Sequence, residues 1–598
     1  MDFTPHESVR NAAVTQRVGQ LRLFVGLVQG GLLYFLYHAQ QAGSWPASAP
    51  ALFYPLVLEA IVLPVLLISS LGHLRRRALA LWLGGAALLL AVVGLHDAWR
   101  SALDPTPLRH PGFLVLPFCL GFFFIAHSLV LAVAHDGRRL VRYATCFDSA
   151  WKLAIQLLFS AMFVLAVWLV MWLGDSLFDL LKLNFLEELL RQSWFAVPLV
   201  CLAFSSAMHT TDVRPAIVRG VRSLLLMLMA WIVPIAVLLV GGFLAALPFT
   251  GLQVLWQTRH ATAVLLAACA VLVVLVNAAF QAGDAAGRLA RGVRLAARVA
   301  CLLLLPLALL GVYALGLRVG DYGWSTDRVI AAACLAAALF YAGGYGWAAV
   351  RRGAPWLDGL RYVNLAAAFV VLALALALFT PVADPARIAV ADQMARLARG
   401  AIPAERFDYN FLRFHGARYG AQALQALAAQ GAGPQAAAVR RRAAATLRMK
   451  YEGPAGRAAA LDVAANLQAW PQGARLPDSL LRQDWHGYRA GQAPGCLLHA
   501  GSRCDAFLMD ADGDGRDEVL LVGHTVRDGE ALLAEREGVW LLAARTPMHV
   551  QLAGCKAWQE RLRAGDYTLA APRLREIEVG GQRIALTPVE PRRLDCGR

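Results

Sequence analysis

The feature that most constrains this chain is a series of eleven apolar runs, each close to the length that a helix needs to cross a lipid bilayer. A bilayer core of about 30 Å requires roughly 20 helical residues. The last run, Leu365 to Phe379, ends at Thr380-Pro381, and no later run is long and apolar enough to span. The runs begin near positions 20, 51, 78, 113, 151, 194, 223, 262, 297, 328 and 362. We therefore predict a polytopic α-helical membrane protein with about 11 transmembrane helices and a C-terminal soluble α+β extracytoplasmic domain.

The overall composition excludes an ordinary soluble protein. The chain of 598 residues is 58% hydrophobic and 16% charged, with a mean hydropathy of +0.53. A formal charge of +16 could favour nucleic acid, but most basic residues before position 381 fall in alternate short loops, where they orient helices. The expected partner is the lipid bilayer, and no nucleic acid is expected. Four lysines against many arginines are typical of a GC-rich bacterial genome.

The loop charges predict the orientation of the spans. The first 19 residues are polar, and the first apolar run is long enough to remain as an anchor, so no cleavable signal peptide is expected. The sixth run, Trp194 to Met208, is the weakest, but deleting it would place the later arginine clusters outside, against the positive-inside rule. We therefore expect a multi-pass protein of the bacterial inner (cytoplasmic) membrane with a cytoplasmic N-terminus and a periplasmic C-terminal domain. The basic residues assigned to the inside are Arg10, Arg17, Arg75, Arg76, Arg77, Arg138, Arg139, Arg142, Lys152, Arg214, Arg219, Arg222, Arg288, Arg291, Arg294, Arg298, Arg351, Arg352 and Arg361.

The chain divides into four expected parts. These are a cytoplasmic N-terminus (1–19), a transmembrane helical domain (20–380), a helical part of the periplasmic domain (381–480) and a β-rich part with a calcium loop (481–598). Helical spacing occurs in Ala386 to Arg399, Tyr419 to Ala429 and Pro434 to Met449. Strand-like runs are Ala506 to Met509, Val519 to Val522 and Val539 to Ala543, with a hairpin from Arg575 to Thr587 turning at Gly580-Gly581.

One further segment, Leu177 to Leu190, alternates apolar residues at helical spacing with Asp179, Glu187 and Glu188. It fits an interfacial amphipathic helix on the outer face, and an extension of the preceding span is the equal alternative.

Four cysteines, Cys496, Cys504, Cys555 and Cys596, lie in the tail, whereas the other six lie in or beside the spans. An even set in a domain predicted to face an oxidising compartment suggests two disulfides. Four cysteines allow three pairings, and closeness in sequence favours Cys496 with Cys504.

The most specific local motif is an Asp/Gly loop between two strand-like runs. Its carboxylates at Asp510, Asp512 and Asp514, a backbone carbonyl at Arg516 and Glu518 at the ninth position could converge on calcium. It is not an EF-hand, because position twelve is Leu521. It resembles the calcium loops of β-propeller type repeats, present here in a single copy. A solvated turn that binds nothing is the alternative.

Ionisable residues inside the spans are candidates for function because they are rare there. Glu59 and His127 both lie mid-span and could form a proton-linked pair; a neutral hydrogen-bonded pair, or no contact, is the alternative. Three further polar residues, Asn277, Asn364 and Tyr345, are expected to make interhelical hydrogen bonds, as is Tyr341.

The richest polar cluster on the expected outer face is the loop that contains Arg318, Asp321, Tyr322, Trp324 and Asp327. A helix N-terminus with aromatic residues at the membrane interface accounts for most of it. A ligand site in which Arg318 pairs with an aspartate is the alternative.

Several stretches resemble a family of bacterial multi-pass membrane proteins catalogued as domain of unknown function 4153. They are Phe147-Asp148-Ser-Ala-Trp151-Lys152, Trp231-Ile-Val-Pro234, Leu247-Pro248-Phe249-Thr250-Gly251-Leu252, Asn277-Ala-Ala-Phe-Gln281 and Tyr322-Gly323-Trp324-Ser325-Thr-Asp327-Arg328. The stretch from Phe407 to Phe414, followed by Arg418-Tyr419-Gly420, is similar to the soluble tails of some members. The resemblance implies an integral inner-membrane protein and supplies no catalytic residues.

Two functions follow as hypotheses. The first is a non-enzymatic membrane anchor that presents a periplasmic domain for binding or sensing, with an envelope ligand or protein as partner. The second is a proton-coupled transporter that uses Glu59 and His127. The chain has no HExxH, GxSxG or Walker-type motif, and no nucleophile and base can be paired from the sequence.

Overall fold

The computed structural model describes most of the chain in two compact units. Unit 1 comprises Met1–Ala404 and Leu412–Arg448, and unit 2 comprises Glu405–Phe411 and Met449–Arg598. The described residues are 5–104, 110–137, 141–251, 261–283, 289–352, 355–404, 406–429, 434–448, 462–483, 485, 493–499, 501–525, 528–536, 539–545, 552, 555–570, 577–579 and 582–584.

Among the described residues, eleven helices of unit 1 are long and apolar enough to cross a membrane, which confirms the predicted polytopic helical membrane fold. The weakest predicted span is among them, as α7. They are α1 (Pro5–Ala42, apolar from Gln16), α2 (Pro50–Ser70), α3 (Arg76–Ser101), α4 (Val115–Asp136), α5 (Tyr143–Asp179), α7 (Ser193–Val213), α8 (Pro215–Thr250), α10 (Ala261–Phe280), α11 (Arg291–Tyr322), α12 (Thr326–Val350) and α13 (Leu360–Leu378).

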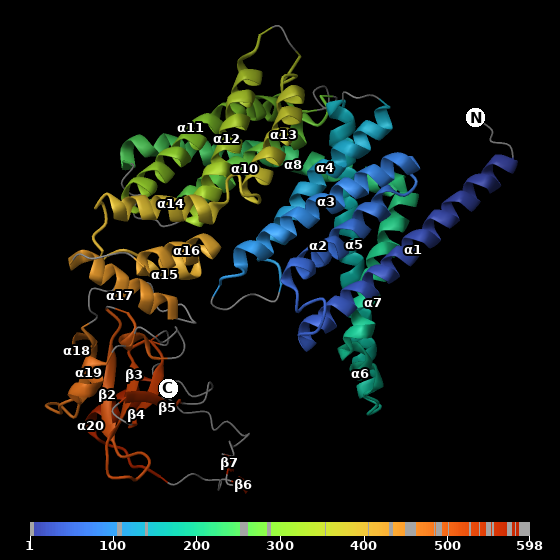
Figure 1. Ribbon diagram of the computed structural model, residues 1–598. Helices are drawn as coiled ribbons and strands as arrows, with labels where there is room; N and C mark the ends of the chain where they lie inside the picture. The colour runs from blue at the N-terminus through green and yellow to red at the C-terminus, as the bar shows by residue number, and fades with distance from the viewer. Residues whose placement is uncertain are drawn as a thin grey trace. The chain divides into compact units, whose positions relative to one another are not determined.

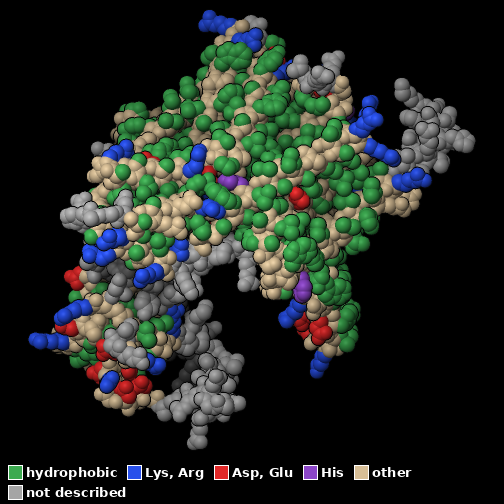
Figure 2. Space-filling model, viewed as in Figure 1, with side chains coloured by type: hydrophobic (Ala, Val, Ile, Leu, Met, Phe, Trp, Pro, Cys, Tyr) green, Lys and Arg blue, Asp and Glu red, His purple; other side chains and the backbone are tan. Residues whose placement is uncertain are grey.

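The spanning helices pack in two groups, α1 to α5 with α7, and α8 with α10 to α13 (Figure 1). Figure 2 shows hydrophobic side chains covering much of the visible face of the helices, as expected for a surface in contact with lipid. Because consecutive spans alternate in direction, the described arginines Arg75, Arg142, Arg214, Arg291 and Arg351 in the connections between spans lie at one end of the bundle. We call this the basic end, and the other the opposite end.

Helices α1 and α7 approach closely because α1 presents glycines to α7. A Cβ atom added at Gly30 would lie 2.4 Å from the Cα atom of Pro198, and one added at Gly26 would lie 2.6 Å from the Cβ atom of Ser205. Gly26 and Gly30 have the GxxxG spacing by which small residues bring membrane helices together. The Ser205 hydroxyl donates to the carbonyl of Arg22 at 2.6 Å and fixes the two helices in register.

The segment predicted as an amphipathic helix forms two pieces. Helix α5 continues through Asp179, and a turn with Lys182 in the left-handed region leads to the short helix α6 (Phe185–Arg191). Leu180 and Leu181 in the turn are exposed. The segment therefore combines a helix extension with a separate short helix.

The helices predicted at the start of the soluble tail are present but belong to unit 1. They are α14 (Pro385–Ala398), α16 (Ala417–Ala428) and α17 (Pro434–Arg448). The short helix α15 (Tyr409–Phe414), between the first two, is divided between the units after Phe411. Helix α14 packs on α12 and α16 packs on α3. The compact units therefore divide near residue 449, whereas the sequence suggested divisions near 381 and 480.

Unit 2 contains a five-stranded sheet in the order β1-β2-β3-β4-β5, with β1 parallel to β2 and the other pairs antiparallel. Trp485, Leu521, Leu533 and Trp540 pack in its core. Sequence patterns predicted β2, β3, β5 and the β6–β7 hairpin but missed β1, β4 and helix α20. The elements are α18 (Val463–Asn466), β1 (Leu467–Trp470), α19 (Asp478–Arg482), β2 (Cys504–Met509), β3 (Glu518–Gly523), β4 (Glu530–Arg536), β5 (Val539–Ala544), α20 (Lys556–Ala564), β6 (Ile577–Val579) and β7 (Gln582–Ile584), with a 3-10 turn at Gly495–Leu497.

Candidate functional site

A cluster of charged side chains in unit 1 surrounds Asp212, in the last turn of α7 at the basic end. Its carboxylate lies 2.7 Å from the Arg22 guanidinium of α1 and 2.6 Å from the Lys152 ammonium of α5. The His73 Nε2 atom, after α2, lies 3.1 Å away. Because Arg22 is buried within the apolar part of α1, its charge requires this partner. The carboxylate thus joins α1, α5 and α7 with the α2–α3 connection.

Beside this cluster, the ends of α2, α4, α5 and α8 enclose a pocket of about 630 Å³, which we call the basic pocket. Three cations line it, Lys152, Arg219 and Arg222, together with two histidines, His73 and His135, and one carboxylate, Asp148. Asp148 is already 2.7 Å from the Arg222 guanidinium. The basic pocket therefore carries excess positive charge.

The basic pocket also has hydroxyl groups and an apolar wall. The polar groups come from Ser69, Thr145, Ser149 and Gln156, and the apolar wall from Leu131, Leu153 and Val218. Such a combination suits a ligand with an anionic part and an organic part.

Glu59 and His127, the candidates for a proton-linked pair, make contacts in different places. His127 is buried, and its Nε2 atom lies 3.0 Å from the Ser69 hydroxyl on α2. Ser69 is ten residues beyond Glu59, or about 15 Å along the helix axis. Glu59 is half-buried beside the packed residues Leu58 and Val62, and it lines neither of the two pockets described for unit 1.

The expected interhelical hydrogen bonds of Asn277 are present and form a closed network of four side chains. The Tyr345 hydroxyl accepts from the Asn277 amide at 2.7 Å and donates to the Asn364 carbonyl oxygen at 2.6 Å. Asn364 in turn donates to the Tyr143 hydroxyl and to Asn277, and Tyr143 donates to Asn277. Helices α5, α10, α12 and α13 each supply one member, so the network ties four spans together.

The predicted outer-face cluster is held against α14. The Arg396 guanidinium donates to the carbonyls of Gly320 and Asp321, and Gln393 donates to those of Tyr322 and Trp324. These bonds use backbone oxygens of the loop. Arg318 lies near the end of α11, and Asp327 lies in the first turn of α12, as expected for a residue that favours a helix N-terminus.

A second pocket of unit 1, about 300 Å³, lies at the opposite end and is lined by Asp97, Arg100, Asp104 and Asp327. Beside it, the fully buried Asp384 caps α14 through the Ala386 amide at 2.8 Å. Its second oxygen lies 3.5 Å from both the His96 and Arg100 side chains. Burial raises the pKa of Asp104, outside the spans, to about 6.

In unit 2, the Asp/Gly loop connects β2 to β3. Ligand atoms of Asp510, Asp512 and Asp514 all lie within 4.8 Å of one another. The Asp510 carboxylate accepts from the amides of Gly513 and Gly515, which both have positive φ angles. The Arg516 amide donates to Asp514, and the largely buried Glu518 accepts from the Ala511 amide. Backbone hydrogen bonds therefore hold the carboxylates close together.

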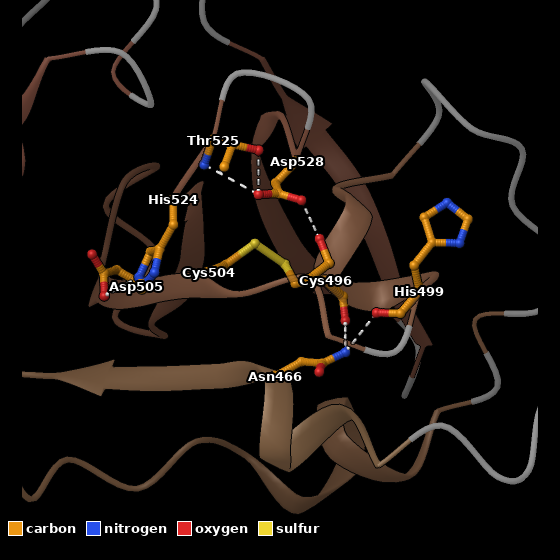
Figure 3. The surroundings of a disulfide bond; sticks show 9 residues. Asn466, Cys496, His499, Cys504, Asp505, His524, Thr525 and Asp528 are labelled. Carbon is orange, nitrogen blue, oxygen red and sulfur yellow. Dashed lines mark hydrogen bonds and ion pairs between the residues drawn. A yellow bond between two sulfur atoms is a disulfide. The ribbon is translucent and has the colours of Figure 1, made fainter. Parts of the chain in front are cut away.

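The favoured disulfide, Cys496–Cys504, is present at the other end of β2 (Figure 3). Asn466 donates to the carbonyls of Cys496 and His499, which ties the disulfide to α18. Cys555 is buried and unpaired. Cys596, its expected partner in one of the pairings, lies outside the described residues.

Next to Cys504, the fully buried Asp505 has three partners. The Arg563 guanidinium of α20 lies 2.7 Å away, the Trp470 indole donates at 2.9 Å, and His524 Nε2 lies 3.3 Å away. Figure 3 shows His524 beside Asp505. This ion cluster links β1, β2 and α20, and the sequence patterns did not indicate it.

The sequence patterns did not indicate the Asp212 cluster either, because Lys152 was interpreted only as a determinant of orientation and Arg22, inside the first span, was not singled out. One signal was present. Asp212 is the only acidic residue between Met208 and Arg222, a segment with three arginines. An isolated acid among basic residues at a span end indicates a specific ion pair.

These features define a multi-pass membrane protein with a separate α+β unit. A family model described as "Domain of unknown function (DUF4153)" matches residues 60–430, and the chain belongs to that family. No curated protein and no solved structure matched the chain.

Proposed function

We propose that the protein is a non-enzymatic anchor of the bacterial inner membrane that presents unit 2 in the periplasm to bind an envelope ligand or protein. An odd number of spans supports this proposal. Eleven crossings put the segment before α1 and the segment after α13 on opposite sides of the membrane. The positive-inside rule then favours a cytoplasmic N-terminus.

The observation that carries the proposal is the distribution of cysteines. The described disulfide, Cys496–Cys504, lies in unit 2, whereas the described cysteines of unit 1 are unpaired. Disulfides persist in oxidising compartments such as the periplasm and are rare in the cytosol. Unit 2 also has its own hydrophobic core, as a domain presented away from the bilayer requires.

We assign calcium to the Asp510 loop as the cofactor of unit 2. Three carboxylates within a short loop repel one another, and a divalent cation removes that repulsion while ordering the turn between β2 and β3. The backbone bonds of Asp510 favour the loop conformation that such a cation needs. The ion would stabilise the unit, and no step of chemistry is assigned to it.

Reporter fusions test the orientation. A fusion after Gly353 should report a cytoplasmic location, and one after Pro385 a periplasmic location, because α13 crosses between them. Alkylation of intact spheroplasts provides an independent measurement. Cys496 and Cys504 are fully buried, so they should become labelled by a membrane-impermeant maleimide only once reduction has destabilised unit 2. A cytoplasmic signal after Pro385 would refute the proposed topology.

A further inference from the structure

The basic pocket points to a ligand of its own, independent of the function proposed for unit 2. Of its three cations, Lys152 and Arg222 have carboxylate partners at 2.6 and 2.7 Å. Arg219 is exposed to the pocket and has no hydrogen-bond or ion-pair partner among the described residues. A cation at the mouth of a pocket of about 630 Å³ is therefore available for a ligand.

The backbone adds positive potential to the same pocket. Helix α5 begins at Tyr143 and lines the pocket with Thr145 and Ser149 from its first turns. Helix α8 begins at Pro215 and lines it with Val218 and Arg219. The N-terminal end of a helix carries a partial positive charge and attracts anions. At α5 the Asp136 carboxylate already accepts from the Arg142 amide and the Thr145 hydroxyl, whereas no described side chain caps α8, so the end of α8 is the one available to a ligand.

Charge balance around the pocket excludes a cation as the preferred ligand. Among the residues that line the pocket, Lys152, Arg219 and Arg222 carry three positive charges and Asp148 carries one negative charge. Two positive charges remain, before any protonation of His73 or His135. An anion would neutralise this excess.

We propose that the basic pocket binds a phosphate-bearing anion through Arg219, with Lys152, Arg222 and the Ser149 hydroxyl as further donors. Arginine matches the oxygen spacing of phosphate, and a tetrahedral group can accept from several directions at once. The apolar wall of Leu131, Leu153 and Val218 would contact the organic part of the ligand. A phospholipid headgroup and a soluble phosphate ester share this chemistry.

The test uses the purified full-length protein in neutral detergent. Its melting midpoint and ligand binding are measured with inorganic phosphate, with short-chain phosphatidylglycerol and with short-chain phosphatidylcholine, at constant ionic strength. Binding of both anionic probes supports recognition of the phosphate group itself. Binding of phosphatidylglycerol alone identifies a lipid headgroup, and binding of phosphate alone identifies a soluble ester.

Variants at two positions locate the site. Arg219→Gln should weaken binding about tenfold to a hundredfold, because it removes a charge-assisted hydrogen bond, and Arg219→Lys should restore part of the affinity. Ala144→Trp should block the pocket without changing its charge, since Ala144 lines it and is exposed. The matched control is Arg291→Gln, which removes an exposed arginine from the same end of the bundle, outside the pocket.

The proposal is overturned if wild type binds neither anionic probe, or if Arg291→Gln weakens binding as much as Arg219→Gln. It is also overturned if Arg219→Gln and Ala144→Trp both remain folded, as judged by circular dichroism, and both bind the anionic probes as tightly as wild type.

Discussion

Replacing Tyr345 by Phe would test how much the closed hydrogen-bond network contributes to the stability of unit 1. The substitution removes a single hydroxyl and leaves the ring, so the fully buried site gains no large cavity. The hydroxyl makes two described hydrogen bonds with asparagine side chains, one as acceptor from Asn277 and one as donor to Asn364.

The structure gives the expected magnitude. Hydrogen bonds between membrane helices contribute on average about 0.6 kcal/mol each and at most about 1.7 kcal/mol. After the substitution, the Asn277 amide keeps its bond to the Val273 carbonyl, whereas the Asn364 oxygen loses the Tyr345 donor. The substitution removes two hydrogen bonds and leaves the Asn364 carbonyl oxygen without its Tyr345 donor. We therefore expect a loss of about 1 to 2 kcal/mol in the free energy of unfolding.

The assay is unfolding of the full-length protein by SDS in mixed micelles, followed by circular dichroism. Tyr362→Phe is the matched control, because Tyr362 lies on α13 and is 66% exposed. It should change the free energy of unfolding by less than about 0.5 kcal/mol. Combining Tyr345→Phe with Asn277→Ala should cost less than the sum of the single changes, since they share one bond. Equal stabilities for the Tyr345 and Tyr362 variants would refute the reasoning.

Three further predictions concern unit 2 and the opposite end of unit 1. Millimolar calcium should protect unit 2 of the full-length protein from thermal proteolysis relative to chelator, because a hundredfold excess over the dissociation constant raises the free energy of unfolding by about 2.7 kcal/mol. Asp512→Ala should remove the difference. Equal protection of wild type with and without calcium would contradict a calcium site. Reduction of Cys496–Cys504, which are 8 residues apart, should destabilise unit 2 by about 2.5 kcal/mol from the entropy of loop closure; Cys496→Ser should match reduced wild type, and insensitivity of wild type to reductant would contradict a structural disulfide. Because burial raises the folded-state pKa of Asp104 to about 6, above an unfolded value of about 3.9, the folded state binds more protons in this window and stability should fall as pH rises from about 4 to 6. Asp104→Asn should flatten that pH dependence of the melting midpoint, and an unchanged profile would argue against a buried carboxyl.

Local sequence determined the membrane fold. Each span is a continuous apolar run, and a run of about 20 such residues has no alternative in a bilayer to an internally hydrogen-bonded helix. The helical spacing of α14, α16 and α17 and the closeness of Cys496 to Cys504 were equally local, so they too could be predicted. Strand β4 was missed because its sequence, Glu530 to Arg536, has charges at both ends and no β-branched residue.

Only the tertiary structure decided which polar groups meet. The cluster at Asp212 brings together residues from α1, α5, α7 and the α2–α3 connection, and no periodicity in the sequence records that convergence. Lys152 belongs to a segment whose charge also suits the positive-inside rule, so topology alone explained it, whereas Arg22 lies inside the first span and was not singled out. Glu59 and His127 both lie mid-span, yet the partner of His127 on α2 is Ser69. Hydrophobicity is a property of each segment, whereas an ion pair depends on how helices pack and rotate against one another. For this reason the sequence determined the spans, and the packing of the helices determined the basic pocket.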